Sequence, residues 1–260
     1  MKIYLNKSCH KGDTFRELLG MWEESGYCQL YENNDRFCWA NGVGQILLYE
    51  YARFDFMPNI NWKWALFSNT QLFHGNCSPW IFWARHPRML EKSINSGIFS
   101  YSERNTESIF LGKIENNIQY NGRMGHDWGK VIEEFSMPIS FGDSTSYPYT
   151  QEEYLDKVKG SKFGLVLPGY GPKCNREIEY LGLGTVPIYT TDSGLHYYDS
   201  LEEGVHYLMV KTPEEIPSLI EKIDEKAWNQ LSINGREWYN KNCSRKGSFE
   251  TTCEIIEEKC

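Results

Sequence analysis

Apolar and polar positions follow two periods along the chain, and these periods predict strands and helices in turn. Phe15, Leu18, Leu19 and Trp22 recur at helical spacing and predict an amphipathic helix over 14–24, with Asp13 at its N-cap. Strand followed by helix favours βα units and a mostly parallel sheet. In the first hundred residues, short apolar runs predict strands at 1–6, 28–31, 45–51, 63–68 and 80–84.

The pattern is more regular after Gly97. Apolar runs predict strands at 108–114, 137–142, 162–169, 185–190 and 206–210. The intervening pattern predicts helices at 127–135, 150–159, 175–183, 213–222 and 224–240. Short βα spacing of this kind is typical of doubly wound nucleotide-binding domains, which bind ligands at the carboxyl ends of their strands. We therefore expect an N-terminal domain over 1–97, a C-terminal domain over 98–223, and a helical segment over 224–260 that packs back on the first domain.

Composition narrows the class of protein. Of the 260 residues, 40% are hydrophobic and 24% are charged, which suits a packed α/β protein. The formal net charge of -8 argues against nucleic acid as a general partner. No apolar run approaches the roughly 20 residues of a membrane span, and no secretory leader pattern is seen, so we expect a cytoplasmic protein.

Cysteine and aromatic residues add two weaker signals. The eight cysteines form no CxxC pair, so a zinc site is not predicted and free thiols are expected. Several tryptophans lie between Trp39 and Trp83. They predict either a packed aromatic core or stacking platforms for sugar rings or a nucleobase.

The strongest chemical signal lies between residues 161 and 191. A buried strand ends at Pro168, Gly169 begins a glycine-containing loop, and a helix starts close to Asn175. Glycines let the backbone approach a ligand, and the first turn of a helix presents unpaired N–H groups. Lys173 and Arg176 flank this turn. A diphosphate bound there would meet backbone amides and two cations.

Glu179 follows Arg176 by three residues, which places both on nearly the same face of the helix. A carboxylate in such a site can accept hydrogen bonds from the two vicinal hydroxyls of a ribose. The alternative is an ordinary surface Arg–Glu pair, which contributes well under about 1 kcal/mol.

A second candidate segment spans 108–123. A predicted strand runs into Gly112 and Lys113, and Arg123 follows, so both cations can face phosphate oxygens. The alternative is a solvated lysine in a turn. Further along, Tyr147 and Tyr149 are candidates for stacking on a uracil ring, although they also suit an ordinary loop.

Together the two segments resemble the exostosin-like glycosyltransferases. The resemblance covers roughly residues 105–210 and is closest to compact, virus-encoded members without a membrane anchor. It rests on Ser161, Lys162, Phe163, Leu165, Arg176, Glu179, Gly184, Val186 and Pro187, with Phe110, Gly112 and Arg123 upstream.

This resemblance implies a GT-B fold, in which two Rossmann-like lobes face a central cleft. The N-terminal lobe would bind an oligosaccharide acceptor and the C-terminal lobe a nucleotide-sugar donor, usually a UDP-sugar. The implied reaction inverts the anomeric carbon, and xylose is the first expectation for the sugar. By the same resemblance, Arg176 and Arg123 neutralise the diphosphate and Glu179 holds the ribose.

The sequence has no Asp-x-Asp pair to hold a metal on the diphosphate, so we expect catalysis without metal or other cofactor, with cations and a helix end in its place. The base should come from the N-terminal lobe. Asp13 is the first candidate, although it also suits a helix cap, and His10 is the second. Other candidates are Asp35, Glu50 and Asp55, whereas Arg85 and Arg88 either contact a ligand or form structural ion pairs.

Two other functions remain open at this stage. A carbohydrate- or nucleotide-binding protein could keep the GT-B fold without turnover. Another nucleotide-dependent α/β enzyme, such as a dehydrogenase, is disfavoured, because the sequence has no complete GxGxxG after a strand and no GxxxxGK[ST]. Donor sugar, acceptor, linkage and oligomeric state are not determined by the sequence.

Overall fold

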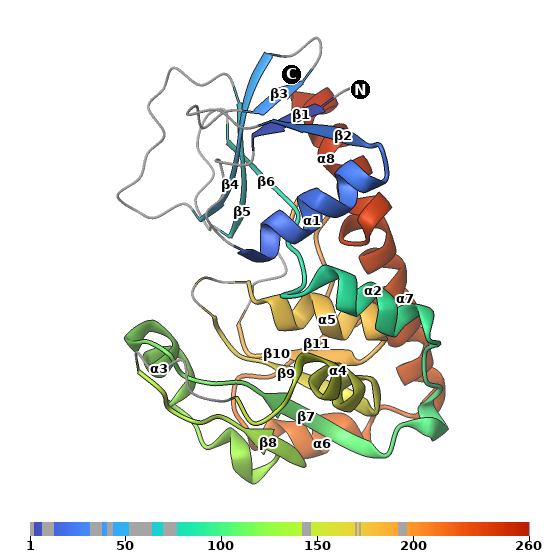
Figure 1. The fold of residues 1–260 in the computed structure, drawn as a ribbon. Helices are drawn as coiled ribbons and strands as arrows, with labels where there is room; N and C mark the ends of the chain where they lie inside the picture. Colours follow the sequence, from blue (N-terminus) through green and yellow to red (C-terminus); the bar gives the residue numbers. More distant parts are fainter. Residues whose placement is uncertain are drawn as a thin grey trace. The chain divides into compact units, whose positions relative to one another are not determined.

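The chain divides into two compact units, which are described separately (Figure 1). The first comprises Met1–Arg88, Leu195–Ser200 and Asn240–Cys260, and the second comprises Met89–Gly194 and Leu201–Tyr239. The sequence predicts a boundary near residue 97, and the chain first leaves unit 1 after Arg88. The computed structural model describes residues 3–6, 13–31, 38–40, 44–51, 64–69, 77–141, 147–169, 171, 173–191 and 197–259.

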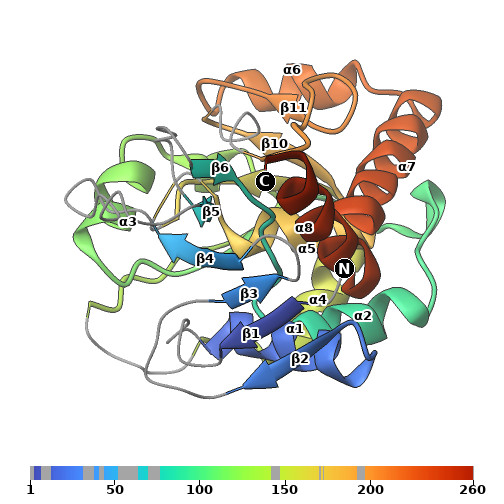
Figure 2. The same ribbon diagram turned by 90° about the horizontal axis from the view of Figure 1, so that it is seen from above.

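A six-stranded sheet forms the centre of the first unit, in the order β2-β1-β3-β4-β5-β6 (Figure 2). β3 is antiparallel to both β1 and β4, whereas the other neighbouring pairs are parallel. Only residues 41–43 connect β3 to β4, and a parallel crossover needs a dozen residues or more, so this short connection enforces the antiparallel pair. The sequence pattern did not predict β3. The strands are β1 (Ile3–Asn6), β2 (Cys28–Tyr31), β3 (Cys38–Ala40), β4 (Gly44–Tyr51), β5 (Trp64–Asn69) and β6 (Cys77–Pro79).

Helix α1 (Asp13–Glu24) buries the predicted apolar stripe and packs against α8 (Arg245–Lys259), the last helix of the chain. The indole Nε1 of Trp22 donates to Ser248 Oγ at 3.0 Å, and that of Trp80 donates to Thr252 Oγ1 at 2.8 Å. These bonds satisfy two buried indole donors and fix the C-terminal helix to the first unit. Within the described ranges, no helix combines the length and apolar character that a membrane span needs.

The predicted strand at 80–84 is wrong. β6 ends at Pro79, and residues 80–84 follow as irregular buried chain. Proline has no N–H to continue a ladder. Trp80 and Trp83 lie with their ring centroids 5.9 Å apart in the core, so they pack the unit and are not exposed stacking platforms. The side chains of Trp39, Trp62 and Trp64 lie outside the described residues.

The second unit contains a five-stranded, fully parallel sheet in the order β11-β10-β9-β7-β8. The first strand in the chain, β7, lies between the second, β8, and the third, β9. This is a doubly wound order, and the direction of winding reverses between β7 and β9, which is where ligands bind in such sheets. The strands are β7 (Thr106–Leu111), β8 (Glu134–Ser136), β9 (Ser161–Val166), β10 (Val186–Tyr189) and β11 (Leu208–Met209).

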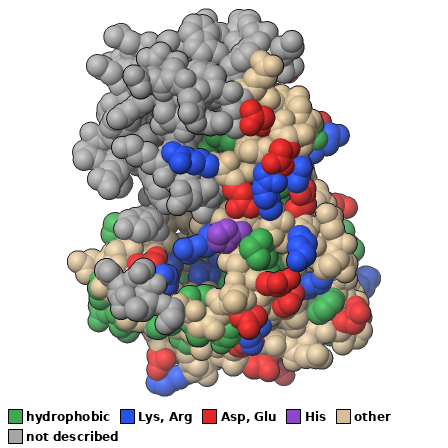
Figure 3. Space-filling view, viewed as in Figure 1, with side chains coloured by type: hydrophobic (Ala, Val, Ile, Leu, Met, Phe, Trp, Pro, Cys, Tyr) green, Lys and Arg blue, Asp and Glu red, His purple; other side chains and the backbone are tan. Residues whose placement is uncertain are grey.

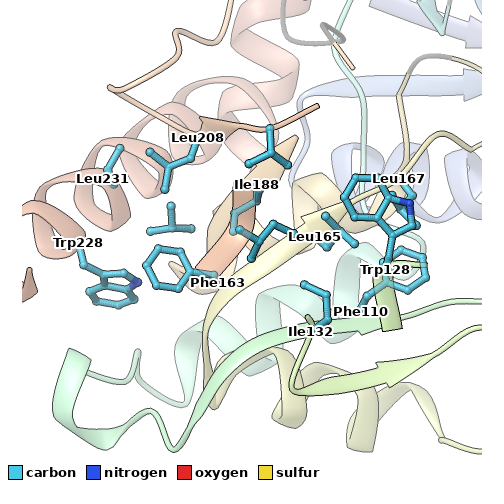
Figure 4. Close-up of a cluster of buried hydrophobic side chains, with 13 residues drawn as sticks. Phe110, Trp128, Ile132, Phe163, Leu165, Leu167, Ile188, Leu208, Trp228 and Leu231 are labelled. Atoms are coloured by element: carbon cyan, nitrogen blue, oxygen red, sulfur yellow. The ribbon is translucent and has the colours of Figure 1, made fainter. Parts of the chain in front are cut away.

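Helices cover this sheet. α4 (Gln151–Lys159) packs against α5 (Asn175–Leu183), and α5 and α6 (Glu215–Glu221) lie on opposite sides of the sheet (Figure 1). α7 (Glu225–Asn242) leads from the second unit into the first. In the core, Phe163 and Leu165 of β9 pack with Ile188 of β10 and with Trp228 of α7 (Figure 4). The remaining helical elements are α2 (Pro87–Asn95) and the 3-10 turns η2 (Tyr101–Glu103) and η3 (Trp128–Lys130).

Two predictions in this unit are wrong. The expected helix over 127–135 is only the short turn η3 followed by β8, because Trp128 and Ile132 pack into the sheet core from irregular chain. The expected strand over 137–142 is not seen in its described part, 137–141, where Ile139 makes only an isolated bridge to Ile114. α3 (Asn117–Arg123) was not predicted, although Asn116 caps it by accepting from Gln119 N–H at 2.9 Å.

Arg104 lies at the edge of the sheet where β9 begins. Its guanidinium donates to the carbonyls of Ser161 and Leu183, each at 2.7 Å, and stacks on the ring of Trp228 at 4.8 Å. Burial lowers the pKa of Arg104 to about 9. Because Ser161 begins β9 and Leu183 ends α5, one side chain holds both elements in register.

The close packing of α5 on β9 gives a stability test. A Cβ at Gly164 would lie 2.5 Å from the buried ring of Tyr180, so Gly164→Ala should destabilise the protein by about 1–3 kcal/mol. Gly125→Ala is the control, because a Cβ at Gly125 would have no atom within 4 Å, and it should change stability by less than about 0.5 kcal/mol. Urea denaturation followed by circular dichroism measures both, and equal stabilities would contradict the packing.

Candidate functional site

The candidate site lies where β7 and β9 end side by side. Gly112 follows β7, and Pro168 and Gly169 follow β9. α3 approaches the same point, since a Cβ at Gly122 would lie 3.3 Å from Pro168. The doubly wound order therefore brings together segments that are some fifty residues apart, and Arg123 and Arg176 meet there.

Arg176, on the first turn of α5, caps the end of β7. Its Nε and Nη2 donate to the Leu111 carbonyl at 3.2 and 2.9 Å, and Nη1 lies 3.7 Å from Cys174 Sγ. The guanidinium stacks on the ring of Phe110 at 4.4 Å. These contacts fix its plane while leaving further N–H groups on Nη1 and Nη2 for a ligand.

Arg123, from α3, joins the ends of both strands. Its Nε donates to the Pro168 carbonyl and its Nη1 to the Lys113 carbonyl, each at 2.7 Å. Its guanidinium lies 5.8 Å from the same Phe110 ring, and the side chain is only 2% exposed. Burial, followed by the repulsion of Arg176, lowers the pKa of Arg123 to about 10.

The hydrogen-bond acceptors of the two guanidinium groups are known within the described part of the chain. Among the described residues, the acceptors of Arg123 and Arg176 are three carbonyls and one thiol, and no Asp or Glu forms an ion pair with either. Removing a charge from water costs several kcal/mol unless it is compensated. Figure 3 shows Lys and Arg side chains among the side chains of the face drawn there. The pair is an electrostatic complement for an anion.

Glycine at position 112 makes this arrangement possible. A Cβ there would lie 2.6 Å from Arg176 Nη2 and 2.9 Å from the Phe110 ring. The sequence suggested that glycines bring backbone close to a ligand, whereas Gly112 makes room for the arginine. Gly169 is tightly placed too, with the Lys173 carbonyl 3.3 Å from its would-be Cβ.

The other predicted cations have their own surroundings. Lys113 is paired with Glu115 at 2.6 Å, so its charge is already compensated. Lys173 is only 1% exposed, just before α5. Asn175 is the first residue of that helix, and the side chain of the N-cap residue Cys174 makes no capping hydrogen bond. The first turn of α5 is thus not capped by the side chain that precedes it.

Glu179 is 3% exposed and accepts a hydrogen bond from the Tyr154 hydroxyl at 2.8 Å. It forms no ion pair with Arg176 in the described part of the chain. The interpretation as a surface Arg–Glu pair is therefore wrong. Although the two residues are three apart, Arg176 turns toward β7 and Glu179 toward α4.

Tyr147 and Tyr149 precede α4 at the same edge of the sheet. Their rings lie edge to face with centroids 5.7 Å apart, and Lys157 Nζ lies 5.2 Å from the ring of Tyr149. Tyr147 is also close enough to interact electrostatically with Arg176. The aromatic pair and the arginine pair therefore border one region of the second unit.

The candidate bases all belong to the first unit. His10, Asp35 and Asp55 lie outside the described residues. Asp13 begins α1 and Glu50 lies in β4, but their side chains are likewise outside the described set. These assignments stay predictions.

Of the two arginines that flank His86 and Pro87, Arg88 has contacts that indicate a structural role. Arg88 donates two hydrogen bonds to Glu24, at 2.7 and 2.6 Å, within the first unit. Its neighbour His86 lies 3.6 Å from Glu17. Arg88 therefore matches the ion-pair interpretation.

Two contributors, Glu115 and Tyr154, were not found from the sequence, and neither was the contact of the Phe110 ring with two guanidinium groups. Phe110 is one of several buried strand residues, and nothing local distinguishes the one whose ring meets two guanidinium groups. Tyr154 meets Glu179 only through the packing of α4 on α5. For Glu115, its closeness to Lys113 in the chain was the available signal.

Comparison of the sequence with models of known protein families and with characterised proteins gives no match. The class of protein therefore rests on fold and site, which define an α/β protein with a doubly wound parallel sheet and a cationic switch point. The described residues contain no group of three or more His, Cys, Asp or Glu side chains that could hold a metal ion. What the arrangement can do is bind a compact anion next to a buried carboxylate.

Inorganic pyrophosphate should bind at this edge, and Arg176→Gln should weaken its binding about tenfold or more, because a hydrogen bond to a charged group contributes about 1.5–3 kcal/mol. Isothermal titration calorimetry gives both Kd values. Lys130→Gln is the control, since it removes one positive charge from an exposed pair with Asp127. A Kd that is the same for Arg176→Gln and wild type would show that this edge does not hold the anion.

Proposed function

We propose that this chain is an inverting glycosyltransferase of the GT-B type, which transfers a sugar from a UDP-sugar to a hydroxyl of an oligosaccharide. The observation that carries the proposal is the pair formed by the buried Arg123 and the half-buried Arg176 at the switch point of a doubly wound sheet, without a carboxylate ion-pair partner among the described residues. A diphosphate is the anion whose charge and size suit two adjacent guanidinium groups.

The proposed reaction places the charge that develops during transfer next to these cations. The acceptor oxygen attacks the anomeric carbon, the bond from that carbon to the diphosphate oxygen breaks, and UDP leaves with the bonding electrons. Arg176 stabilises the leaving diphosphate by fixed N–H donors and positive charge. Arg123 holds the ends of both strands in place and adds its charge.

The acceptor proton passes to a base that we assign to the N-terminal unit, with Asp13 first and His10 second. Glu179 accepts hydrogen bonds from the ribose, and Tyr147 and Tyr149 stack on uracil. Xylose is the first sugar to test. The packing of α4 against α5 supports placing the ribose and uracil subsites next to each other.

A panel of nucleotide sugars tests the donor directly. UDP-sugars, and UDP-xylose first, should raise the melting temperature, because a ligand present at a hundred times its Kd stabilises the folded state by about 2.7 kcal/mol. The Arg176→Ala variant should show a much smaller rise. Release of UDP in the presence of an oligosaccharide acceptor then measures transfer. Donor binding without any release across an acceptor panel would favour a non-catalytic binding protein instead.

Transfer should not need a metal ion, because guanidinium groups supply the positive charge at the diphosphate. The initial rate of UDP release should therefore be the same with and without EDTA. Loss of turnover in EDTA that manganese restores would reject this part of the mechanism, while leaving the binding of the nucleotide intact.

A further inference from the structure

The ring of Phe110, near the end of β7, contacts three planar groups. The guanidinium of Arg176 is the nearer of two cations, with its Cζ 4.4 Å from the ring centroid. The guanidinium of Arg123 lies farther away, at 5.8 Å. The third group is the ring of Phe135, which stacks on Phe110 with the centroids 5.5 Å apart and the planes 26° apart. Phe110 is fully buried, so a cation of the candidate site rests on a ring that belongs to the core of the sheet.

The hydrogen bonds of Arg176 leave the tilt of its guanidinium plane open. Its Nε and Nη2 both donate to one oxygen, the Leu111 carbonyl, at 3.2 and 2.9 Å. Two donors that converge on a single acceptor atom still allow the group to tilt about that atom. The contact of Nη1 with Cys174 Sγ is long, at 3.7 Å, and sulfur is a weak acceptor. Among the described contacts, the face of the Phe110 ring is therefore the one that sets this tilt.

The space around the guanidinium is narrow. A Cβ at Gly112 would lie 2.6 Å from Arg176 Nη2 and 2.9 Å from the Phe110 ring, so not even a methyl group fits between the three residues. A smaller side chain without a ring at position 110 would remove the face on which the guanidinium lies. It would also leave room into which the guanidinium could turn.

We propose that Phe110 is a positioning residue of the anion site, which holds the guanidinium of Arg176 in the orientation that binds the anion. The inference rests on the proposed function, because that anion is the diphosphate of the proposed donor. Since its side chain is fully buried, Phe110 acts through Arg176 and not by contact with the anion.

The physical reason is the cost of a binding orientation that is only partly populated. When a group adopts its binding orientation for a fraction of the time, the apparent Kd rises by the inverse of that fraction. The attraction of a cation to the face of an aromatic ring is strong enough to change such a population from about twofold to about thirtyfold. An aliphatic side chain offers no such face, so the guanidinium spreads over several orientations.

Phe135 provides a matched control. It lies in β8, it stacks on the other aromatic ring of the pair, and no contact with Arg123 or Arg176 is found for it among the described residues. Phe135→Leu and Phe110→Leu therefore remove the same atoms from the same aromatic pair. Only Phe110→Leu removes the ring on which the guanidinium lies.

The experiment measures Kd for inorganic pyrophosphate by calorimetry with the full chain. Phe110→Leu should weaken binding about fivefold. Phe135→Leu should keep the wild-type Kd within about twofold, although both variants should lower the melting temperature. In an Arg176→Gln background, adding Phe110→Leu should weaken binding by less than about twofold more, because the group that the ring positions is then absent.

Other outcomes overturn the proposal. If Phe135→Leu weakens binding as much as Phe110→Leu, or if the full effect of Phe110→Leu persists in the Arg176→Gln background, Phe110 has only a packing role. A wild-type Kd in Phe110→Leu rejects the proposal, and the anion site still stands if Arg176→Gln weakens binding. A wild-type chain that binds no pyrophosphate rejects the anion site and the proposed function with it. Should Phe110→Leu fail to fold, Phe110→Met, which has a longer apolar side chain and no ring, must show the same loss, and an unchanged Kd overturns the proposal.

Discussion

At the ends of β7 and β9, backbone carbonyls accept hydrogen bonds from arginine guanidinium groups, and this constraint connects the fold of the second unit with its candidate site. Leu111 ends β7, and its carbonyl, which lies beyond the ladder to β9, accepts from Arg176, while Pro168 just beyond β9 accepts from Arg123. A buried carbonyl left without a donor costs about 1–3 kcal/mol, so these arginines stabilise the strand ends. The same bonds hold two positive charges at the switch point of the sheet. The side chains that stabilise the strand ends are therefore the ones on whose charge the proposed anion binding depends.

Two like charges in one buried region repel each other, and the lowered pKa of Arg123 reflects both that repulsion and its burial. Part of the cost is offset locally, because both guanidinium groups face the ring of Phe110 and such contacts contribute about 0.5–2 kcal/mol. A bound anion would offset the remainder, because it would place an opposite charge next to both guanidinium groups.

The sequence predicted the regular part of the second unit well, because its signals are local. The helix over 175–183 matches α5, and Thr150 begins α4 as an N-cap with a complete capping box. Predictions failed where tertiary packing replaced periodicity: Trp128 and Ile132 have helical spacing but enter the core from a short turn. At the site, Arg123, Arg176 and Gly112 were named as candidates from the sequence, but the groups that they contact were not. Backbone carbonyls leave no trace in a sequence, and the meeting of Tyr154 with Glu179 is set by how α4 packs on α5.

The contacts show that Lys113, Arg123 and Arg176 are not equivalent, although each carries one positive charge. The charge of Lys113 is compensated by Glu115. Arg123 is only 2% exposed, and it donates two hydrogen bonds to backbone carbonyls. Arg176, which is half-buried, keeps N–H donors that its contacts with Leu111 and Cys174 do not use. Since Arg176 turns toward β7 and Glu179 toward α4, a nucleotide that used both would lie across the start of α5, with its diphosphate over β7 and its ribose over the junction with α4. Its base would then extend toward Tyr147 and Tyr149, which precede α4. Because Arg176 and Glu179 point in different directions from the same part of α5, together they define how the proposed donor would run along the sheet edge. Neither residue alone would define this direction.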